Sequence, residues 1–411
     1  MITVEEAIEA ILQEIRPLGL ESVGIHDALG RALGEDVAAQ RSNPPWDNSA
    51  MDGYALRSAD VAGASKDAPA SLKVVYDLPA GGVPKAAVGP GEAVRIMTGA
   101  PVPPGADAVV MVEETEAGNG TVAIKKAARP GENIRRSGED FRAGDIVLKK
   151  GAVIRAAEVA MLATVGAPCV FVHKRPRVAV ISTGDELAEI ERTPGAGKIS
   201  NSNGHALAAL VAEAGATPVQ LGIARDTKES LKERLEAARS CDCIISSGGV
   251  SVGDYDFVKD VLAEMGSRML FWKVAMKPGK PLAFGVIAGV PAFGLPGNPI
   301  SSMVAFEQFV RPAILKMSGH NAIVRARLDA RLLAEVKIKP GRTNFLRGLL
   351  KIEAEGLTVA PLEGQGSGII STMVASNCFI VVPKDSAGFK RDAAVKVQPF
   401  DPSVFLKEYG G

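Results

Sequence analysis

The sequence is poor in the residues that usually build metal and redox centres. It contains four cysteines and four histidines in 411 residues. Cys241 and Cys243 lie too close together for the usual zinc spacing, and the scattered histidines add no companion ligands. The cysteines lie in or beside apolar runs, where buried free thiols are common. We therefore predict free thiols and no zinc site.

An excess of one charge is also absent. Lysine plus arginine and aspartate plus glutamate are equal at 47 each, so the net charge does not indicate a nucleic-acid or anionic-membrane partner. Any anion site must therefore be local. No apolar run approaches the roughly 20 residues of a membrane span, and the amino terminus begins with an acidic amphipathic segment instead of a signal peptide. We expect a cytoplasmic protein without nucleic-acid or membrane partners.

Three common enzyme motifs are missing. A P-loop built on Gly197 and Lys198 would need glycine at 192 and a hydroxyl at 199, where Arg192 and Ile199 stand. No Gly-x-Gly-x-x-Gly opens a helix after a strand, and there is no Gly-x-Ser-x-Gly elbow. A kinase, a dehydrogenase and an α/β-hydrolase are therefore unsupported.

What is present is a change of pattern along the chain. Short alternating runs with Gly/Pro turns from residue 54 to about 140 predict a small β-barrel or sandwich. From 177 to 265, strands alternate with helices, which predicts right-handed crossovers and a parallel sheet covered on both faces. Strand alternation returns after Gly319. The fold class is therefore multidomain α/β, with a parallel-sheet αβα domain, a β-rich insertion and a C-terminal β-barrel-like domain.

This pattern suggests a division into four parts, at the upper end of the about 2 to 4 domains that this length predicts. A helical, linking part comprises 1–45 and 141–175, and its first helix spans 3–15 with a capping box. The other three parts are the β-rich insertion at 46–140, the αβα domain at 176–319 and the C-terminal β domain at 320–411.

Acidic turns follow two neighbouring strands of the predicted parallel sheet. Asp185 and Glu186 follow the first, and a glycine-rich loop leading to Asp254 and Asp256 follows the third. The carboxyl ends of parallel strands lie at one edge, where two such acids can share a magnesium ion, which prefers oxygen ligands. Alternatively, Asp254 is a helix N-cap and Asp256 complements the helix dipole.

Other loops leave similar alternatives open. Asp226 follows the second strand, where capping of the next helix competes with chemistry. A turn rich in proline and glycine carries Lys273, Lys277 and Lys280. These lysines form either an anion-binding site or a solvated run of charges. Asn298 and Pro299 suit the N-cap and first position of a helix.

Six stretches resemble the successive motifs of one family, in order along the chain: residues 49–55, 95–101, 177–187, 246–253, 277–281 and 295–299. The family is that of the MoeA proteins, the molybdopterin molybdenumtransferases, which are similar to the E domain of gephyrin. The resemblance extends essentially from end to end, and it makes the αβα domain one of the molybdopterin-binding type.

The resemblance implies an elongated homodimer that inserts molybdate into adenylylated molybdopterin with magnesium and releases AMP. It also implies an adenylyltransferase as a possible partner that supplies the substrate. Two alternatives remain: a molybdopterin adenylyltransferase acting one step earlier, or a gephyrin-like scaffold that binds peptide partners.

The resemblance also implies roles for individual residues. Glu186 and Asp256 would be the magnesium-side acids. The catalytic set would be Asp52, Thr98, Asp140 and Asp226. The substrate-binding set would be Ser247, Gly248, Gly249, Ser251, Lys273, Lys277, Lys280, Pro296, Pro299, Arg347 and Ser367. Within it, the lysines and Arg347 would hold phosphate or molybdate.

Overall fold

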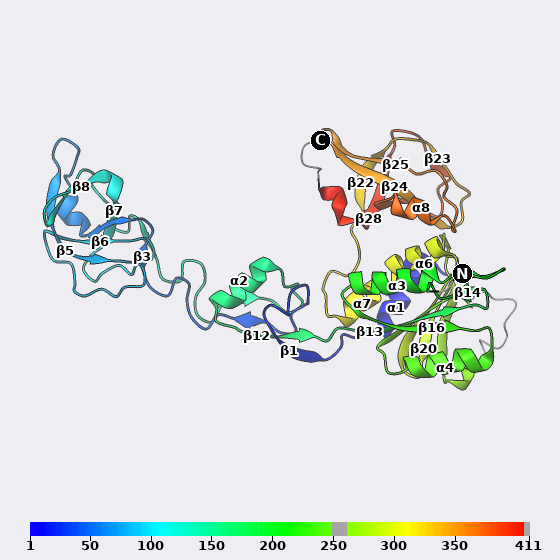
Figure 1. Ribbon diagram of the computed structural model, residues 1–411. Coiled ribbons are helices and arrows are strands. Elements are labelled where there is room, and N and C mark those ends of the chain that lie inside the picture. Colours follow the sequence, from blue (N-terminus) through cyan, green and yellow to red (C-terminus); the bar gives the residue numbers. More distant parts are fainter. Residues whose placement is uncertain (192, 249–260, 407–411) are drawn as a thin grey trace. The chain divides into compact units, whose positions relative to one another are not determined.

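The computed structural model describes residues 1–191, 193–248 and 261–406 (Figure 1). The chain folds into two compact units. Unit 1 contains residues 1–34, 151–155 and 169–411, and unit 2 contains residues 35–150 and 156–168. The predicted fold class, a multidomain α/β protein with a parallel-sheet domain and two β-rich regions, is confirmed.

Unit 2 is built on a six-stranded sheet with the strand order β7-β4-β6-β5-β9-β8. Apolar side chains lie on both faces of this sheet, because Tyr54 and Leu56 join one apolar cluster and Ala55 joins another. Its strands are β4 (Gly53–Leu56), β5 (Ala70–Leu78), β6 (Glu92–Ile96), β7 (Ala108–Met111), β8 (Thr115–Ala117) and β9 (Thr121–Ile124).

Short strand pairs and one helix complete unit 2. β3 pairs with β10, and β2 pairs with β11. The elements are β2 (Val37–Ala38), β3 (Asn48–Ser49), β10 (Ile134–Arg135), β11 (Ile146–Leu148), α2 (Ala156–Thr164) and the 3-10 turns η1 (Ser58–Val61) and η2 (Val112–Glu114).

The αβα part of unit 1 contains a six-stranded sheet in the order β16-β13-β17-β21-β20-β18. The first four strands are parallel, and β20 and β18 extend the sheet in antiparallel fashion. The strands are β13 (Arg177–Thr183), β16 (Thr217–Ala224), β17 (Cys243–Ser247), β18 (Arg268–Lys273), β20 (Pro281–Ile287) and β21 (Val290–Leu295).

Helices cover both faces of this sheet, as the strand sequences require. Along β13, Val178 and Val180 pack into one apolar cluster, while Ala179 and Ile181 pack into another. The first cluster involves α1 (Val4–Glu14), α3 (Ser202–Glu213), α6 (Pro299–Ala305), the π-helical turn η3 (Phe306–Val310) and α7 (Arg311–Met317); the second involves α4 (Lys228–Ala238). Side chains that alternate between two apolar layers explain why these strands are hydrophobic without interruption.

The C-terminal part is a closed β-barrel, because β24 pairs with both β25 and β26 and thereby joins the two ends of the sheet. The ring order is β24-β25-β22-β28-β26. Its elements are β22 (Leu328–Leu332), β23 (Val336–Lys337), β24 (Thr343–Glu353), β25 (Gly356–Pro361), α8 (Ile370–Val374), β26 (Cys378–Val382), β27 (Gly388–Phe389), β28 (Ala394–Pro399) and η4 (Pro402–Phe405).

The barrel and the αβα part are joined within unit 1 by strand pairing. β19 (Met276–Lys277) follows the sheet strand β18 and pairs in parallel with the start of β24. The remaining short strands of unit 1 are β1 (Leu20–Gly24), β12 (Cys169–His173), β14 (Leu187–Ala188) and β15 (Ile199–Ser200).

The predicted helix ends are correct in some places and wrong in others. Thr3 and Glu6 form the predicted capping box of α1. Pro299 is the first residue of α6, but the side chain of its N-cap residue, Asn298, makes no capping hydrogen bond. The prediction that Asp226 caps α4 is wrong. Thr227 is the N-cap residue of this helix, and its side chain accepts a hydrogen bond from the Ser230 N–H.

Three of the four cysteines are buried free thiols, as predicted, whereas Cys169 is exposed. No helix among the described residues is long and apolar enough to cross a membrane.

Candidate functional site

The carboxyl ends of β13 and β16 present the acidic turns predicted from the sequence. Asp185 and Glu186 follow β13 and are exposed, and Asp226 follows β16 and is half-buried. Gly184 has φ +145°, a backbone conformation that residues with a side chain rarely adopt, so the turn favours glycine. The sheet edge therefore gathers three of the acids identified in the sequence.

A set of reciprocal hydrogen bonds joins the two turns. The Asp185 N–H donates to Asp226 Oδ2 at 3.2 Å, and the Asp226 N–H donates to Asp185 Oδ1 at 3.3 Å. Arg225 Nη1 lies 3.0 to 3.4 Å from the carbonyl oxygens of Gly184, Asp185 and Leu187. The carboxylates of Asp185 and Asp226 thus orient backbone as well as carrying charge.

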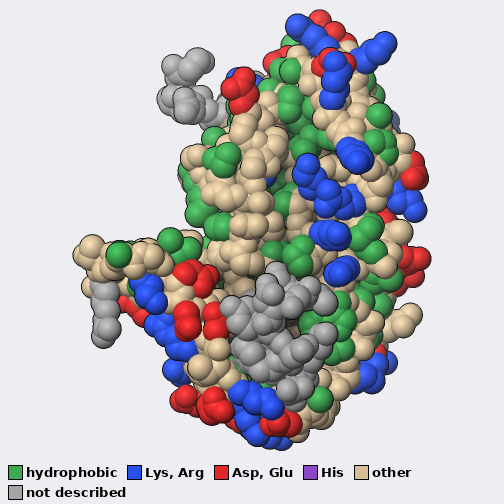
Figure 2. Space-filling view, turned by 90° about the vertical axis from the view of Figure 1, so that its right-hand side faces the viewer, with side chains coloured by type: hydrophobic (Ala, Val, Ile, Leu, Met, Phe, Trp, Pro, Cys, Tyr) green, Lys and Arg blue, Asp and Glu red, His purple; other side chains and the backbone are tan. Residues whose placement is uncertain are grey.

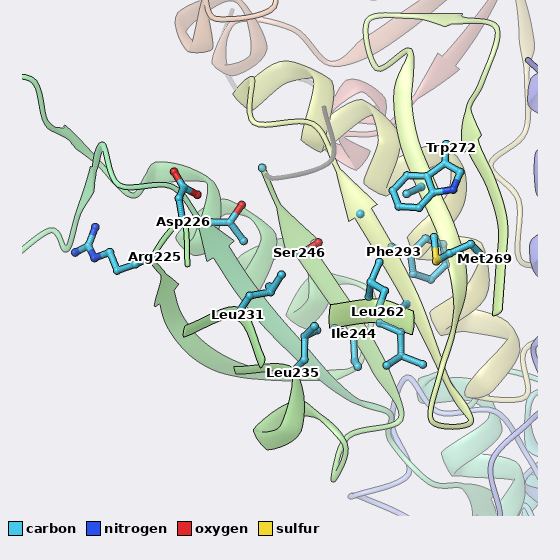
Figure 3. A pocket seen from close by; sticks show the side chains of 16 residues that line it. Arg225, Asp226, Leu231, Leu235, Ile244, Ser246, Leu262, Met269, Trp272 and Phe293 are labelled. Carbon is cyan, nitrogen blue, oxygen red and sulfur yellow. The ribbon is translucent and has the colours of Figure 1, made fainter. Parts of the chain in front are cut away.

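Figure 3 shows Arg225, Asp226 and Ser246 at the strand ends, with the side chains of Leu231 and Ile244 below them. The apolar cavity beneath is small, about 60 Å³. Ligand pockets usually measure about 300 to 1,000 Å³. The volume of this cavity is well below that range.

The end of β17 meets the turn before α6, which brings several predicted substrate-binding residues together. Gly248 N–H donates to the Leu295 carbonyl at 3.0 Å, and Ser247 Oγ lies 3.5 Å from the Pro296 carbonyl. Asn203 Nδ2, from α3, donates to Ser247 Oγ at 2.8 Å and to the Gly297 carbonyl at 2.7 Å. Pro299 then begins α6 beside this junction.

The predicted residues Gly249, Ser251 and Asp256 lie outside the described part of the chain, as do Asp254 and much of the helix predicted to follow it. Among the residues that are described, no group of three or more His, Cys, Asp or Glu side chains could hold a metal ion. Of the two acids implied for magnesium, only Glu186 is therefore placed here.

A pocket of about 760 Å³ lies between the αβα part and the barrel, and Lys277, Lys280 and Ser367 line it. Lys273 is at the exposed end of β18 and does not line this pocket. Figure 2 shows one face of unit 1 on which lysine and arginine side chains gather, with most of the carboxylates toward its margins. We call the pocket of about 760 Å³, together with the residues that line it, the lysine pocket.

Arg347 lies beside the lysine pocket but is fully buried, which differs from an anion-binding side chain at a surface. Its Nε donates to Thr372 Oγ1 at 2.7 Å, and its Nη2 donates to the carbonyls of Gly364 at 2.9 Å and Gly366 at 3.1 Å. Nη1 has no hydrogen-bond partner among the described residues. In this arrangement Arg347 supports the turn at 364–368, which we call the glycine turn. A direct contact of Arg347 with phosphate or molybdate stays a prediction.

The glycine turn is also held against the αβα part. The Ser367 carbonyl accepts from the Ile300 N–H of α6 at 3.1 Å. Gln365 binds the Arg347 backbone at both its N–H and its carbonyl, at 3.0 and 2.9 Å. Ser367 is thus fixed at the rim of the lysine pocket by contacts from β24 and from α6.

Unit 2 brings two of its predicted residues together. Asp52 Oδ1 accepts from both the N–H and the hydroxyl of Thr98, each at 2.7 Å. Because these donors stabilise the charged form, they lower the pKa of the exposed Asp52 carboxyl, and the backbone N–H has the larger effect. Asp140 is separate from this pair, and its Oδ2 accepts from Asn43 Nδ2 at 3.0 Å.

Sequence reasoning missed several residues in these places: Asn203, Arg225, Lys337, Arg342 and Gln365. Asn203 follows a polar Asn-Ser run after a strand, which is a detectable signal. The barrel residues gave none, because nothing local indicates that β24 reaches the αβα part.

Comparison with known proteins matches three family models to successive parts of the chain. Residues 2–166 match the MoeA N-terminal region (domain I and II), residues 179–316 match a probable molybdopterin binding domain, and residues 329–400 match the MoeA C-terminal region (domain IV).

Full-length relatives agree. The molybdopterin molybdenumtransferase of Staphylococcus aureus is 38% identical over 400 residues, covering 96% of this chain and 95% of the relative. That of a Nostoc species is 40% identical over 374 residues, covering 88% and 85%. The crystal structure of the molybdopterin biosynthesis moeA protein from Pyrococcus horikoshii OT3 matches with a TM-score of 0.85 and 32% identity, covering 97% of this chain and all of that one. The chain therefore belongs to the MoeA family of molybdopterin molybdenumtransferases.

Proposed function

We propose that this chain inserts molybdate into adenylylated molybdopterin and releases AMP, as a transferase of molybdenum cofactor biosynthesis. The observation that carries the proposal is the lysine pocket. It is large enough for a small ligand, and Lys277 and Lys280 are exposed within it without a carboxylate partner in the described part of the chain. Relatives that match most of the chain are named molybdopterin molybdenumtransferases, and a transfer of this kind is consistent with that name.

The residues of the pocket suit the chemistry of this transfer. Molybdate is a tetrahedral oxyanion, and ammonium groups placed in a partly enclosed pocket hold such an anion. Departure of AMP places negative charge on the leaving phosphate, which nearby cations stabilise. The glycine turn that carries Ser367 is held by hydrogen bonds within the protein, so binding an anion beside it needs little rearrangement of this turn.

Magnesium is a second part of the proposal. Carboxylate oxygens are ligands that magnesium prefers, and it often takes only one or two carboxylates with substrate phosphate completing its shell. Glu186, exposed at the sheet edge, fits as one holder, and Asp256 is proposed as the other. The ion would neutralise charge on the adenylate phosphate. Asp52, Thr98, Asp140 and Asp226 remain proposed catalytic residues.

The remaining proposals concern the oligomeric state, the partner protein, the cellular location and the domain division. We retain the homodimer, the substrate-supplying adenylyltransferase partner, the cytoplasmic location and the four-part division of the chain as predictions. Light scattering of the purified chain tests the dimer.

The proposal is tested by incubating the purified chain with adenylylated molybdopterin, molybdate and magnesium, and measuring AMP by chromatography. AMP should appear only when molybdate and magnesium are both present. AMP transfer from ATP to molybdopterin would instead identify an adenylyltransferase. No turnover in either assay, together with capture of peptide partners by a variant lacking the active-site acids, would favour the scaffold.

A further inference from the structure

Arg342 is an unassigned cation in the lysine pocket. It precedes β24, is half-buried, and lines the pocket with Lys277 and Lys280. β19 pairs with β24 so that Lys277 lies opposite Asn344, two residues beyond Arg342. Strand pairing therefore places Arg342 in the wall of the pocket, beside the end of β19 that carries Lys277.

Hydrogen bonds hold the backbone on either side of Arg342, whereas its side chain makes no hydrogen bond or ion pair with the described residues. The Asn344 side chain donates to the Arg342 carbonyl at 2.7 Å, and the Thr343 N–H donates to the Ala275 carbonyl at 2.9 Å. The Arg342 guanidinium has no ion pair or hydrogen bond in residues 1–191, 193–248 and 261–406. By contrast, the Arg347 guanidinium five positions further on donates to three acceptors.

The charges of the pocket lining are unbalanced. The cationic side chains are Lys277, Lys280, Lys337 and Arg342, and the acidic ones are Glu335 and Glu363, which leaves a net charge of +2. Lys337 is paired with Glu335 at 3.1 Å. Lys277, Lys280 and Arg342 then carry three positive charges against the single negative charge of Glu363. A dianion would neutralise this net charge of +2 better than a monoanion of the same shape.

We propose that Arg342 determines anion specificity in this pocket by selecting tetrahedral oxyanions with two negative charges over those with one. The preference comes from the positive charge of Arg342, because its Coulomb attraction to a dianion is twice that to a monoanion at the same distance. The planar guanidinium fork directs that charge at the oxygens of the bound tetrahedron. The inference rests on the proposed function only in taking the lysine pocket as the anion site.

The test is calorimetric titration of the purified full chain with molybdate and with perrhenate, a tetrahedral oxyanion of similar size but single charge. Wild type should bind molybdate more tightly. Arg342→Gln should lose about tenfold in molybdate affinity, as for one charge-assisted hydrogen bond. Its perrhenate affinity should fall only about threefold, because the Coulomb term is halved. The preference for molybdate should therefore fall about threefold.

Two variants serve as controls. Lys351→Gln removes one positive charge from the exposed face of β24, away from the pocket, and should leave both affinities unchanged. Arg342→Lys keeps the charge and should retain most of the preference, which keeps the proposal testable if Arg342→Gln unfolds. An unchanged preference in Arg342→Gln, an equal loss in Lys351→Gln, or a complete loss in Arg342→Lys would each overturn the assignment.

The result is separable from that of the turnover assay. If wild type releases AMP but binds molybdate no better than perrhenate, the role of Arg342 is wrong and the proposed function stands. If wild type prefers molybdate but releases no AMP, the proposed function is wrong and the role of Arg342 stands.

Discussion

The acidic turns and the lysine pocket hold their charges in opposite ways. Asp185 and Asp226 accept each other's backbone N–H groups, and Asp52 accepts two donors from Thr98. Lys277 and Lys280 have no such partner in the part of the chain that the structure describes. Acids in tight turns readily find backbone N–H donors within reach, whereas an ammonium on an extended turn does not find acceptors so easily.

This difference separates orientation from binding. A carboxylate that also binds backbone has a fixed direction, but part of its hydrogen-bonding capacity is already used. A lysine without a local partner keeps its full capacity for a ligand. The turns therefore provide fixed geometry and the pocket provides affinity, and the following predictions test that division.

The largest effect is expected at Glu186, the exposed acid of the β13 turn. Glu186→Gln should lower molybdate-dependent AMP release by about 1,000-fold, because the charge is lost where metal and phosphate are proposed to meet. Stability should be unchanged, since the side chain is exposed. The measurements are AMP release and thermal unfolding.

Glu191→Gln is the matched control, because it removes the same charge from an exposed position five residues further on. Full activity of Glu186→Gln, or an equal loss in Glu191→Gln, would show that the turn contributes no specific charge.

A large effect on stability is expected at Arg347, whose guanidinium group, unlike the ammonium groups of Lys277 and Lys280, is already hydrogen-bonded within the protein. Arg347→Met leaves the carbonyls of Gly364 and Gly366 and the hydroxyl of Thr372 without their donor. Such a loss should lower the free energy of unfolding by about 3 kcal/mol. Urea denaturation measures it.

Arg391→Met, an exposed arginine of the same barrel, should change the free energy of unfolding very little. If Arg347→Met proved as stable as Arg391→Met while losing molybdate binding, Arg347 would be an anion ligand and not a support of the turn.

The sequence predicted the parallel-sheet part well because its signals are local. The uninterrupted apolar strands and the capping box at Thr3 each determine a nearby element. The acids at the strand ends could be grouped for the same reason, since parallel strands end at one edge. The cap of α4 was missed by one residue because Asp226 and Thr227 are both good caps, and a tertiary contact with Asp185 decided between them.

The lysine pocket could be predicted only in part. Lys277 and Lys280 stood out in the sequence, but Arg342 lies 62 residues beyond Lys280 and reaches the pocket only through the pairing of β19 with β24. Parallel pairing of two short segments leaves no periodic signal in either one. For the same reason, the burial of Arg347 could not be seen before the turn at 364–368 was placed over it.

A moderate effect is expected for the lysines themselves. Lys277→Ala and Lys280→Ala should each weaken molybdate binding about tenfold at low ionic strength, and by less at 0.5 M salt, because exposed charges are screened within about 10 Å or less. Calorimetry across a salt series measures this. Lys273→Ala, outside the pocket, should have a smaller effect at every salt concentration, and equal effects at all three positions would argue against a defined site.

The smallest effect concerns how Asp52 is oriented. The N–H and hydroxyl of Thr98 lower its pKa below the ordinary value of 3.8, so Thr98→Val, which removes only the hydroxyl, should raise the pKa part of the way back. Because the pKa is lowered in the folded state, the bonds stabilise the fold above the ordinary value, and this contribution disappears as pH falls through the lowered pKa. Wild type and Thr98→Val should therefore differ slightly in stability near neutral pH and converge in strong acid. Carbon-detected NMR titration of the Asp52 carboxyl measures the pKa directly. Thr98→Ser keeps the hydroxyl and should leave the pKa low; if Thr98→Val did so too, the backbone N–H alone would orient Asp52.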